Sequence, residues 1–361
     1  MSEQALDKAA QIRAGEELNV EALTRYLQQQ LPHKPQSIEV KQFPSGYSNL
    51  TYLIQAGQHE YVLRRPPFGA NIKSAHDMGR EYRVLAALKP TYGKVPTPVL
   101  YEADETVLGA PFYMMERVKG IILRNKPPKG LDLTPELMQR ISEATVDNMV
   151  ALHTLDLEAN GLAGMGKPDG YIQRQVEGWT QRYQKAETDT VENMNKVANW
   201  LLQNMPADNT AAFIHNDYKY DNLVLNAQEP WNITAVLDWE MATVGHPLMD
   251  LGTTLGYWAE PADHDALKPF NLTWMPGNLT RQQVAQRYAE RTGTPMDDLV
   301  FYFAFGAFKI GVIVQQIYAR FKKGLTKDPR FAALIFVVHA CANNAAQAIE
   351  LNRISDLHSK S

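Results

Sequence analysis

The chain has 361 residues, of which 45% are hydrophobic and 21% charged, and its formal net charge is −4. This composition supports a folded core and argues against global disorder, and the negative charge argues against a general nucleic-acid-binding protein. The length fits two domains or one large bilobal unit. Cys341 is the only cysteine, which excludes an internal disulfide and fits a reducing compartment.

The sequence offers little sign of export or membrane insertion. The first residues contain no apolar run of the secretory type. The most apolar stretch, residues 301–318, is interrupted by Lys309, Gln315 and Gln316, which is typical of a core helix. We therefore expect a cytoplasmic protein with no membrane partner and no nucleic-acid partner.

The first third of the chain predicts an antiparallel sheet with two helices. Asn19 is a suitable N-cap for the first helix, and Pro90 ends the second. Short runs rich in β-branched and aromatic residues, separated by turn residues, predict a meander. The expected elements are helices over residues 19–31 and 74–90, strands over 38–43, 50–57 and 60–67, and two further strands within 95–120.

The rest of the chain is mainly helical in pattern, so the expected fold class is α+β. Thr134 and Pro135 form an N-terminal helix signal. Residues 161–168 match the opening of a phosphate-binding P-loop, but Pro168 stands where Ser or Thr belongs, so we interpret the match as chance. The further expected helices cover residues 171–187, 190–205, 280–293, 296–324 and 328–352.

A polar constellation stands out in residues 213–239. Asp217 and Asn222 fit the pattern HxDxxxxN, and Asp238 ends a second apolar run. A hairpin formed by the two runs would place all three side chains at the same end. Phosphoryl transfer needs a carboxylate beside the attacking hydroxyl and oxygen ligands for Mg²⁺. This spacing predicts Asp217 as the catalytic carboxylate, Asn222 and Asp238 as metal ligands, and Lys219 as a charge that reaches the γ-phosphate.

This segment resembles the catalytic loop and metal-binding triplet of the protein kinase-like superfamily. Asn216 replaces the usual Arg, and Trp239-Glu240 replaces Phe-Gly. With GHPLMDLG at 245–252 and no Ala-Pro-Glu signature, the chain is similar to the aminoglycoside phosphotransferase and choline kinase group, above all to the kinase-like domains linked to acyl-CoA dehydrogenases. The resemblance implies a bilobal protein kinase-like fold, with a small antiparallel-sheet N-lobe over residues 1–117 and a mainly helical C-lobe over 118–361.

The resemblance also implies roles for residues outside the hairpin. Arg64 falls where kinases carry a phosphate-binding Lys, and Glu81 on the next helix would be its partner. His215 and Asp250 would support the catalytic loop. The other implied nucleotide-binding residues are Ser48 and Asn49 in the phosphate loop and the hinge from Glu116 to Val118. The expected substrate contacts are Glu260, Asp263, Tyr318 and Arg320.

The leading hypothesis is a phosphotransferase that uses ATP and Mg²⁺ to phosphorylate a hydroxyl group of a small molecule. Similarity to the dehydrogenase-linked domains favours a hydroxyacyl or CoA-linked acceptor. An aminoglycoside-type kinase and a non-catalytic nucleotide-binding pseudokinase stay open as alternatives. The missing peptide-docking signatures argue against a protein kinase. The sequence leaves the oligomeric state open.

Overall fold

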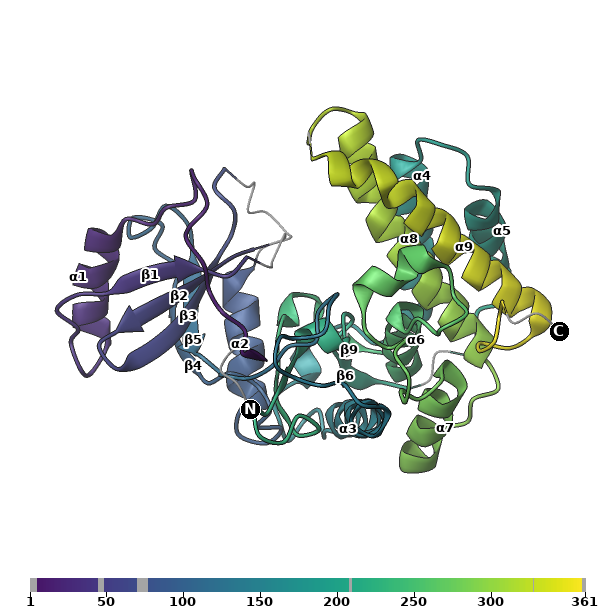
Figure 1. The fold of residues 1–361 in the computed structure, drawn as a ribbon, viewed down its shortest axis with the longest axis horizontal. Helices are drawn as coiled ribbons and strands as arrows, with labels where there is room; N and C mark the ends of the chain where they lie inside the picture. The colour runs from purple at the N-terminus through teal and green to yellow at the C-terminus, as the bar shows by residue number, and fades with distance from the viewer. Residues whose placement is uncertain (1–4, 45–48, 70–76, 208–209, 327, 359–361) are drawn as a thin grey trace.

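The computed structural model describes residues 5–44, 49–69, 77–207, 210–326 and 328–358. It has two lobes, with the N-terminal sheet on one side and the helices of the C-terminal part on the other (Figure 1). This arrangement confirms the expected α+β, kinase-like bilobal fold.

The N-lobe is built on a five-stranded antiparallel sheet in the order β1-β2-β3-β5-β4. Side chains alternate between its two faces. In β3, Leu63 packs on the outer face and Val62 on the face toward the C-lobe, and both are buried. The strands are β1 (Glu39–Gln42), β2 (Leu50–Ala56), β3 (His59–Arg65), β4 (Pro98–Glu102) and β5 (Phe112–Glu116).

One helix covers each face of this sheet (Figure 1). Helix α1 (Val20–Gln30) starts where Asn19 accepts a hydrogen bond from the backbone N–H of Ala22, as the sequence predicts. Helix α2 (Met78–Leu88) lies on the other face, between the sheet and the C-lobe. Residues on α2 can therefore contact both lobes.

The C-lobe is mainly helical, as expected, and two of its helices cross in close contact. A Cβ atom on Gly252 or on Gly306 would collide with the other helix's backbone, so α6 and α8 meet there because both positions are glycine. This crossing fixes two helices that support the site. The helices are α3 (Pro135–His153), α4 (Tyr171–Ala186), α5 (Glu192–Gln203), α6 (Pro247–Tyr257), α7 (Arg281–Thr292), α8 (Leu299–Lys322) and α9 (Leu334–Leu351).

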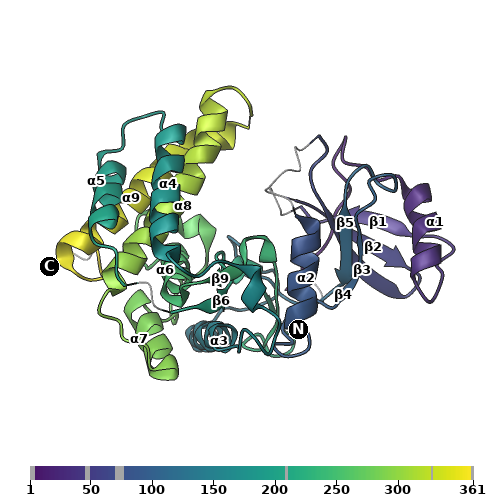
Figure 2. The ribbon, with the colours of Figure 1, turned by 180° about the vertical axis from the view of Figure 1, so that it is seen from behind.

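Two short antiparallel pairs lie at the base of the C-lobe, beside the N-lobe (Figures 1 and 2). The predicted hairpin forms from β7 (Leu223–Leu225) and β8 (Ile233–Val236). A second pair, β6 (Ala212–Ile214) with β9 (Thr243–Gly245), encloses it and was not predicted. The two pairs bring the segments around residues 215–222 and 237–242 together.

Among the residues that the structure describes, two helical segments are long and apolar enough to cross a membrane, Leu299–Lys322 and Pro329–Leu351. In the first, 78% of the most apolar window is buried inside the protein, and in the second 44%. The first is thus accounted for as a core helix, in agreement with the interpretation of residues 301–318.

Candidate active site

Asp250, at the start of α6, holds the candidate catalytic loop, residues 215–222, in place. Its carboxylate accepts hydrogen bonds of 2.7 Å from the backbone N–H groups of His215 and Asn216. His153 also contacts it, at 3.1 Å. Burial alone would raise the pKa of Asp250, but the hydrogen bond from His153 and the neighbouring His215 lower it below the usual value. The buried carboxylate therefore stays ionised and fixes the loop, which is the supporting role predicted for it.

His215 connects the two halves of the hairpin. Its Nδ1 accepts from the backbone N–H of Asp217 at 3.2 Å, and its Nε2 lies 2.9 Å from the carbonyl oxygen of Leu237. The first contact uses Nδ1 as the acceptor, and the second joins Nε2 to a carbonyl oxygen. His215 thus holds Asp217 in register with Leu237, the residue before Asp238.

Asp217 lies among donors that fix its carboxylate. Nζ of Lys219 lies 2.9 Å from Oδ2 and 3.0 Å from Oδ1, and Nδ2 of Asn222 donates to Oδ2 at 3.0 Å. The ring of Tyr257 lies beneath the Lys219 ammonium at 4.6 Å. Burial opposes the charge on Lys219, but Tyr257 and Asp217 raise its pKa above the usual value. Lys219 is therefore a fixed cation beside Asp217.

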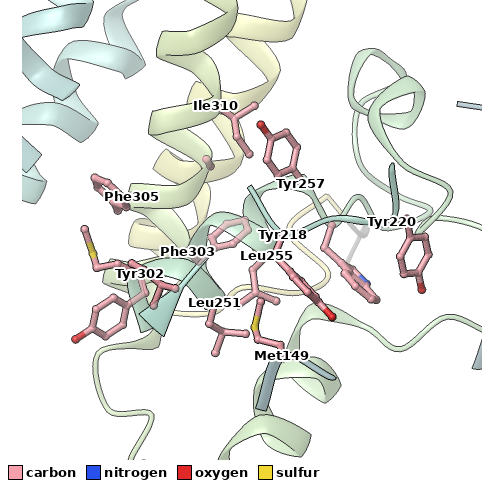
Figure 3. Packing of buried hydrophobic residues seen from close by; sticks show 14 of the residues in the cluster. Met149, Tyr218, Tyr220, Leu251, Leu255, Tyr257, Tyr302, Phe303, Phe305 and Ile310 are labelled. Carbon is pink, nitrogen blue, oxygen red and sulfur yellow. The ribbon is translucent and has the colours of Figure 1, made fainter. Parts of the chain in front are cut away.

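Aromatic packing supports this loop from below (Figure 3). Tyr218 and Tyr220 are buried beside Leu255 and Tyr257 of α6. The hydroxyl of Tyr218 donates to the carbonyl of Thr145 at 2.9 Å. The alternation of HNDYKYDN thus places tyrosines in the core and leaves Asp217 and Lys219 at the surface of the site.

Asp238 faces the N-lobe. One guanidinium nitrogen of Arg64 lies 3.0 Å from its Oδ1, and the other lies 3.2 Å from Oε2 of Glu81. The predicted pairing of Arg64 with Glu81 is therefore confirmed. Burial opposes the charge of Arg64, but Glu81 and Asp238 raise its pKa well above the usual value. Arg64 can reach two carboxylates at once because its guanidinium is a planar fork, which the Lys of other kinases lacks.

Further contacts tie the lobes together around Glu240. Nδ2 of Asn49 donates to Oε2 of Glu240 at 2.9 Å and to Oε1 of Glu81 at 3.3 Å. Arg80, beside Glu81 on α2, donates to the carbonyl groups of Glu240, Met165 and Ala242. Asn49 is thus occupied at the lobe junction. Ser48, the other predicted phosphate contact, lies outside the described residues.

The hinge keeps one backbone donor available. The N–H of Glu116 bonds to Thr97 at 2.8 Å, and that of Arg117 bonds to Glu60 at 3.1 Å. Among the described residues, the Val118 N–H makes no hydrogen bond. Val118 also packs on a small apolar cluster of Ile122, Val224, Ala235 and Leu237. Of the predicted hinge, Val118 therefore offers the donor and the apolar surface that a planar base needs.

The predicted substrate role of Glu260 and Asp263 is corrected. Both are buried, 5% and 4% exposed, and both pair with Arg281, at 3.1 and 2.8 Å. Arg281 is itself only 1% exposed. From the sequence, the acidic residues within 260–265 were predicted to form a substrate-binding loop. In the structure, the carboxylates of Glu260 and Asp263 instead pair with the buried guanidinium of Arg281.

Tyr318 and Arg320 lie far along α8 from the catalytic loop. Lys309, on the same helix, reaches that loop, and a helix rises about 1.5 Å per residue, which places Tyr318 roughly 14 Å further along the axis. Tyr318 is buried and Arg320 is exposed. A substrate contact at these positions stays a prediction and requires an extended acceptor.

Lys309 is a site residue whose position the sequence did not reveal. It is 2% exposed, and its ammonium donates to the carbonyl oxygen of Asn216 at 2.8 Å. Burial lowers the pKa of Lys309 to about 8, although Asp250 and Asp217 act in the opposite direction. The Lys309 ammonium, which is shielded from water, thus holds the backbone of Asn216, the residue before Asp217.

This lowered pKa gives a testable pH dependence. The folded pKa of about 8 lies below the ordinary lysine value of 10.5, so between them the unfolded chain binds more protons. The free energy of unfolding should rise with pH across this interval, by up to about 1.4 kcal/mol per pH unit. Lys309→Met should lack this rise, measured by urea unfolding. Lys322→Met, an exposed position on α8, should retain it, and a rise that survives in Lys309→Met would contradict the assignment.

The donor set fits Mg²⁺. Nδ2 of Asn222 points at Asp217, which leaves its Oδ1 for another ligand, and its backbone carbonyl accepts from the N–H of Leu237 at 2.8 Å. Asn222 directly precedes β7 and Asp238 lies just after β8, so the two residues lie at the same end of the hairpin and offer hard oxygen atoms. Within the described ranges no group of three or more His, Cys, Asp or Glu side chains could hold a metal. The protein would therefore supply two ligands and the phosphates others, as Mg²⁺ with a nucleotide requires.

Comparison with known proteins agrees with this geometry. Residues 39–286 match the model of the phosphotransferase enzyme family. The chain is 34% identical over 328 residues to acyl-CoA dehydrogenase family member 11 of Gallus gallus, and 33% identical over 322 residues to that of Homo sapiens. Each match covers 87% of this chain and 41% of the relative, so the chain spans about two-fifths of these longer proteins.

Solved structures show the same fold. A protein of Ralstonia eutropha JMP134, provisionally described as an aminoglycoside phosphotransferase, has a TM-score of 0.77 and 31% identity over 93% of this chain and 99% of its own. The aminoglycoside phosphotransferase APH(4)-Ia, solved with AMP-PNP and hygromycin B, has a TM-score of 0.56 and 18% identity over 89% of this chain and 96% of its own, and shows the fold alone. The chain therefore belongs to the phosphotransferase enzyme family, with the kinase-like fold, and that membership supports a small-molecule kinase activity in general.

Proposed function

We propose that this protein transfers the γ-phosphoryl group of ATP to a hydroxyl group of a small molecule. The observation that carries the proposal is the convergence of Asp217, Asn222 and Asp238, each with its position fixed by hydrogen bonds. Asp217 lies beside the Lys219 ammonium at 2.9 Å, and Asp238 lies 3.0 Å from Arg64. A protein that only bound nucleotide, without catalysis, would have no physical need for all three of these side chains.

The roles of the residues follow from their positions. Asp217 orients the acceptor hydroxyl and takes its proton as the bond to phosphorus forms. Lys219 and Arg64 neutralise phosphate charge. Bound Mg²⁺ and ATP would supply the phosphoryl group and further charge neutralisation, with Asn222 and Asp238 as the protein ligands. Val118 provides a hinge donor for the base.

The acceptor we propose is a hydroxyacyl compound, free or linked to CoA. Its support is the similarity to proteins named acyl-CoA dehydrogenases. The aminoglycoside alternative needs acidic groups that face a cationic substrate, but Glu260 and Asp263 are buried against Arg281. Their burial argues against a direct contact of these two carboxylates with an aminoglycoside.

The test is ADP release over a panel of acceptors, with and without Mg²⁺. The panel contains hydroxy acids, their CoA esters, choline, homoserine and aminoglycosides. We expect Mg²⁺-dependent release that a hydroxy acid or its CoA ester stimulates. Stimulation by an aminoglycoside alone would refute the proposed acceptor. ATP binding without stimulation by any member would favour a nucleotide-binding module.

A further inference from the structure

A basic pocket of about 440 Å³ opens beside the catalytic loop, between α4 and the N-terminal end of α2. Figure 2 shows α4, β9 and α2 on this face. Four cationic side chains line it, and no Asp or Glu does. The cationic residues are Arg80, Lys167, Arg174 and Arg182.

The cationic groups that line this basic pocket make no close ion pair in the described structure. Over the described ranges, no carboxylate lies within 4.0 Å of any of the four cationic groups. Arg174 donates to the carbonyls of Lys167 and Asp169, and in the described structure the guanidinium of Arg80 likewise donates only to carbonyl groups. Carbonyl groups fix the position of a guanidinium without neutralising it. The concentration of positive charge contrasts with the net charge of −4 for the whole chain.

The basic pocket adjoins the residues that carry the proposed chemistry. Asn216, which lines it, is the residue before Asp217, and Met241 and Thr243 follow the metal-binding triplet. Lys309 joins the two regions, because its ammonium bonds to Asn216 and lies 5.7 Å from the ring of Trp179 in the pocket wall. A molecule in the pocket is therefore close to Asp217.

We propose that the basic pocket binds an anionic group of the acceptor, a phosphate or a carboxylate, while the acceptor's hydroxyl lies at Asp217. Arginine forks match both of these anions, and Trp179 offers an apolar wall for the carbon chain between them. The acceptor class is thus a hydroxylated molecule with a remote negative charge. The inference rests on the proposed function for the hydroxyl, but anion binding itself can be measured without turnover.

Arg182 is the most informative position. It is exposed on α4, its guanidinium lies 4.7 Å from the ring of Trp179, and its charge interacts with that of Lys309. Arg182→Gln should therefore fold normally. Lys185→Gln is a matched control, since Lys185 is exposed on the same helix, loses the same charge and does not line the pocket.

The first arm measures binding of inorganic phosphate by calorimetry, with the nucleotide site filled by ADP and Mg²⁺. We expect wild type and Lys185→Gln to bind alike, and Arg182→Gln to bind about tenfold more weakly, as for loss of one charge-assisted hydrogen bond. Absent phosphate binding in wild type, or an equal loss in both variants, would overturn the proposal. This arm supports the anion site even if no acceptor in the panel is phosphorylated.

The second arm distinguishes the acceptor's own anion from a free phosphate effector. With an anionic hydroxy acid as acceptor, phosphate should compete and Arg182→Gln should raise KM about tenfold. With the neutral methyl ester of the same acid, neither added phosphate nor Arg182→Gln should alter KM. Inhibition or activation of both acceptors alike would mean an effector site and would overturn the acceptor assignment.

Discussion

Asp217→Asn should reduce kcat for phosphoryl transfer by about 10²–10⁴-fold, the usual contribution of a positioned general base. The amide keeps the shape of the side chain but cannot accept the proton. The substitution alters the Asp217 side of the contact with Lys219, which is 2.9 Å long in the wild type, and leaves Lys219 itself unchanged. ATP binding should change little, because Arg64, Asp238 and the hinge are untouched. Steady-state kinetics with a calorimetric ATP titration measures both quantities.

Asp221→Asn provides the matched control for this experiment. Asp221 lies on the same loop, but its carboxylate pairs with Arg124 at 2.7 Å. Its side chain is 36% exposed, so the loss of this pair should affect neither kcat nor folding appreciably. Wild-type turnover in Asp217→Asn, or equal losses in both variants, would contradict the assigned base.

Arg281→Met should destabilise the protein by roughly 3–5 kcal/mol, because it leaves two buried carboxylates without their cation. Arg281 is 1% exposed and contacts both Glu260 and Asp263. It begins α7, so the loss would loosen residues 260–281 as a unit. Chemical unfolding monitored by tryptophan fluorescence measures the change.

Arg287→Met on the same helix is the comparison. Arg287 makes two hydrogen bonds of 2.8 Å to Asp147, but Asp147 is 38% exposed and Arg287 25%. Water can replace this contact, so the expected cost is about 1 kcal/mol or less. Similar costs at the two positions would refute the structural role of Glu260 and Asp263 and reopen their assignment to substrate.

Local sequence rules were sufficient for much of the fold. Asn19 and Thr134 are the caps of their helices, and the predicted hairpin pairs Leu223 with Val236. These features depend on neighbouring residues, where side-chain chemistry and period carry the signal. The pairing of Arg64 with Glu81 came from the resemblance, and it holds although Arg replaces Lys.

Contacts between residues far apart in the sequence could not be predicted from local sequence patterns. Nothing near Glu260 in the sequence identifies Arg281, 21 positions away, as its partner. Lys309 lies in an apolar helix, and its bond to Asn216 spans 93 positions. The basic pocket likewise combines α2, α4 and three further segments, around residues 165–167, 216 and 241–243. Such contacts depend on how elements pack, so a polar residue's spacing alone cannot tell whether it serves the core or the site.

The central claim is that the phosphoryl group reaches a hydroxyl of a small, anionic acceptor. Phosphorus-31 NMR of wild type with ATP, Mg²⁺ and each hydroxy acid or CoA ester tests it most directly, because it shows the new ester itself. We predict a phosphomonoester signal that grows as ATP declines and that is absent with Asp217→Asn. Decline of ATP to ADP and inorganic phosphate alone, or no change of ATP while it binds, would contradict this account.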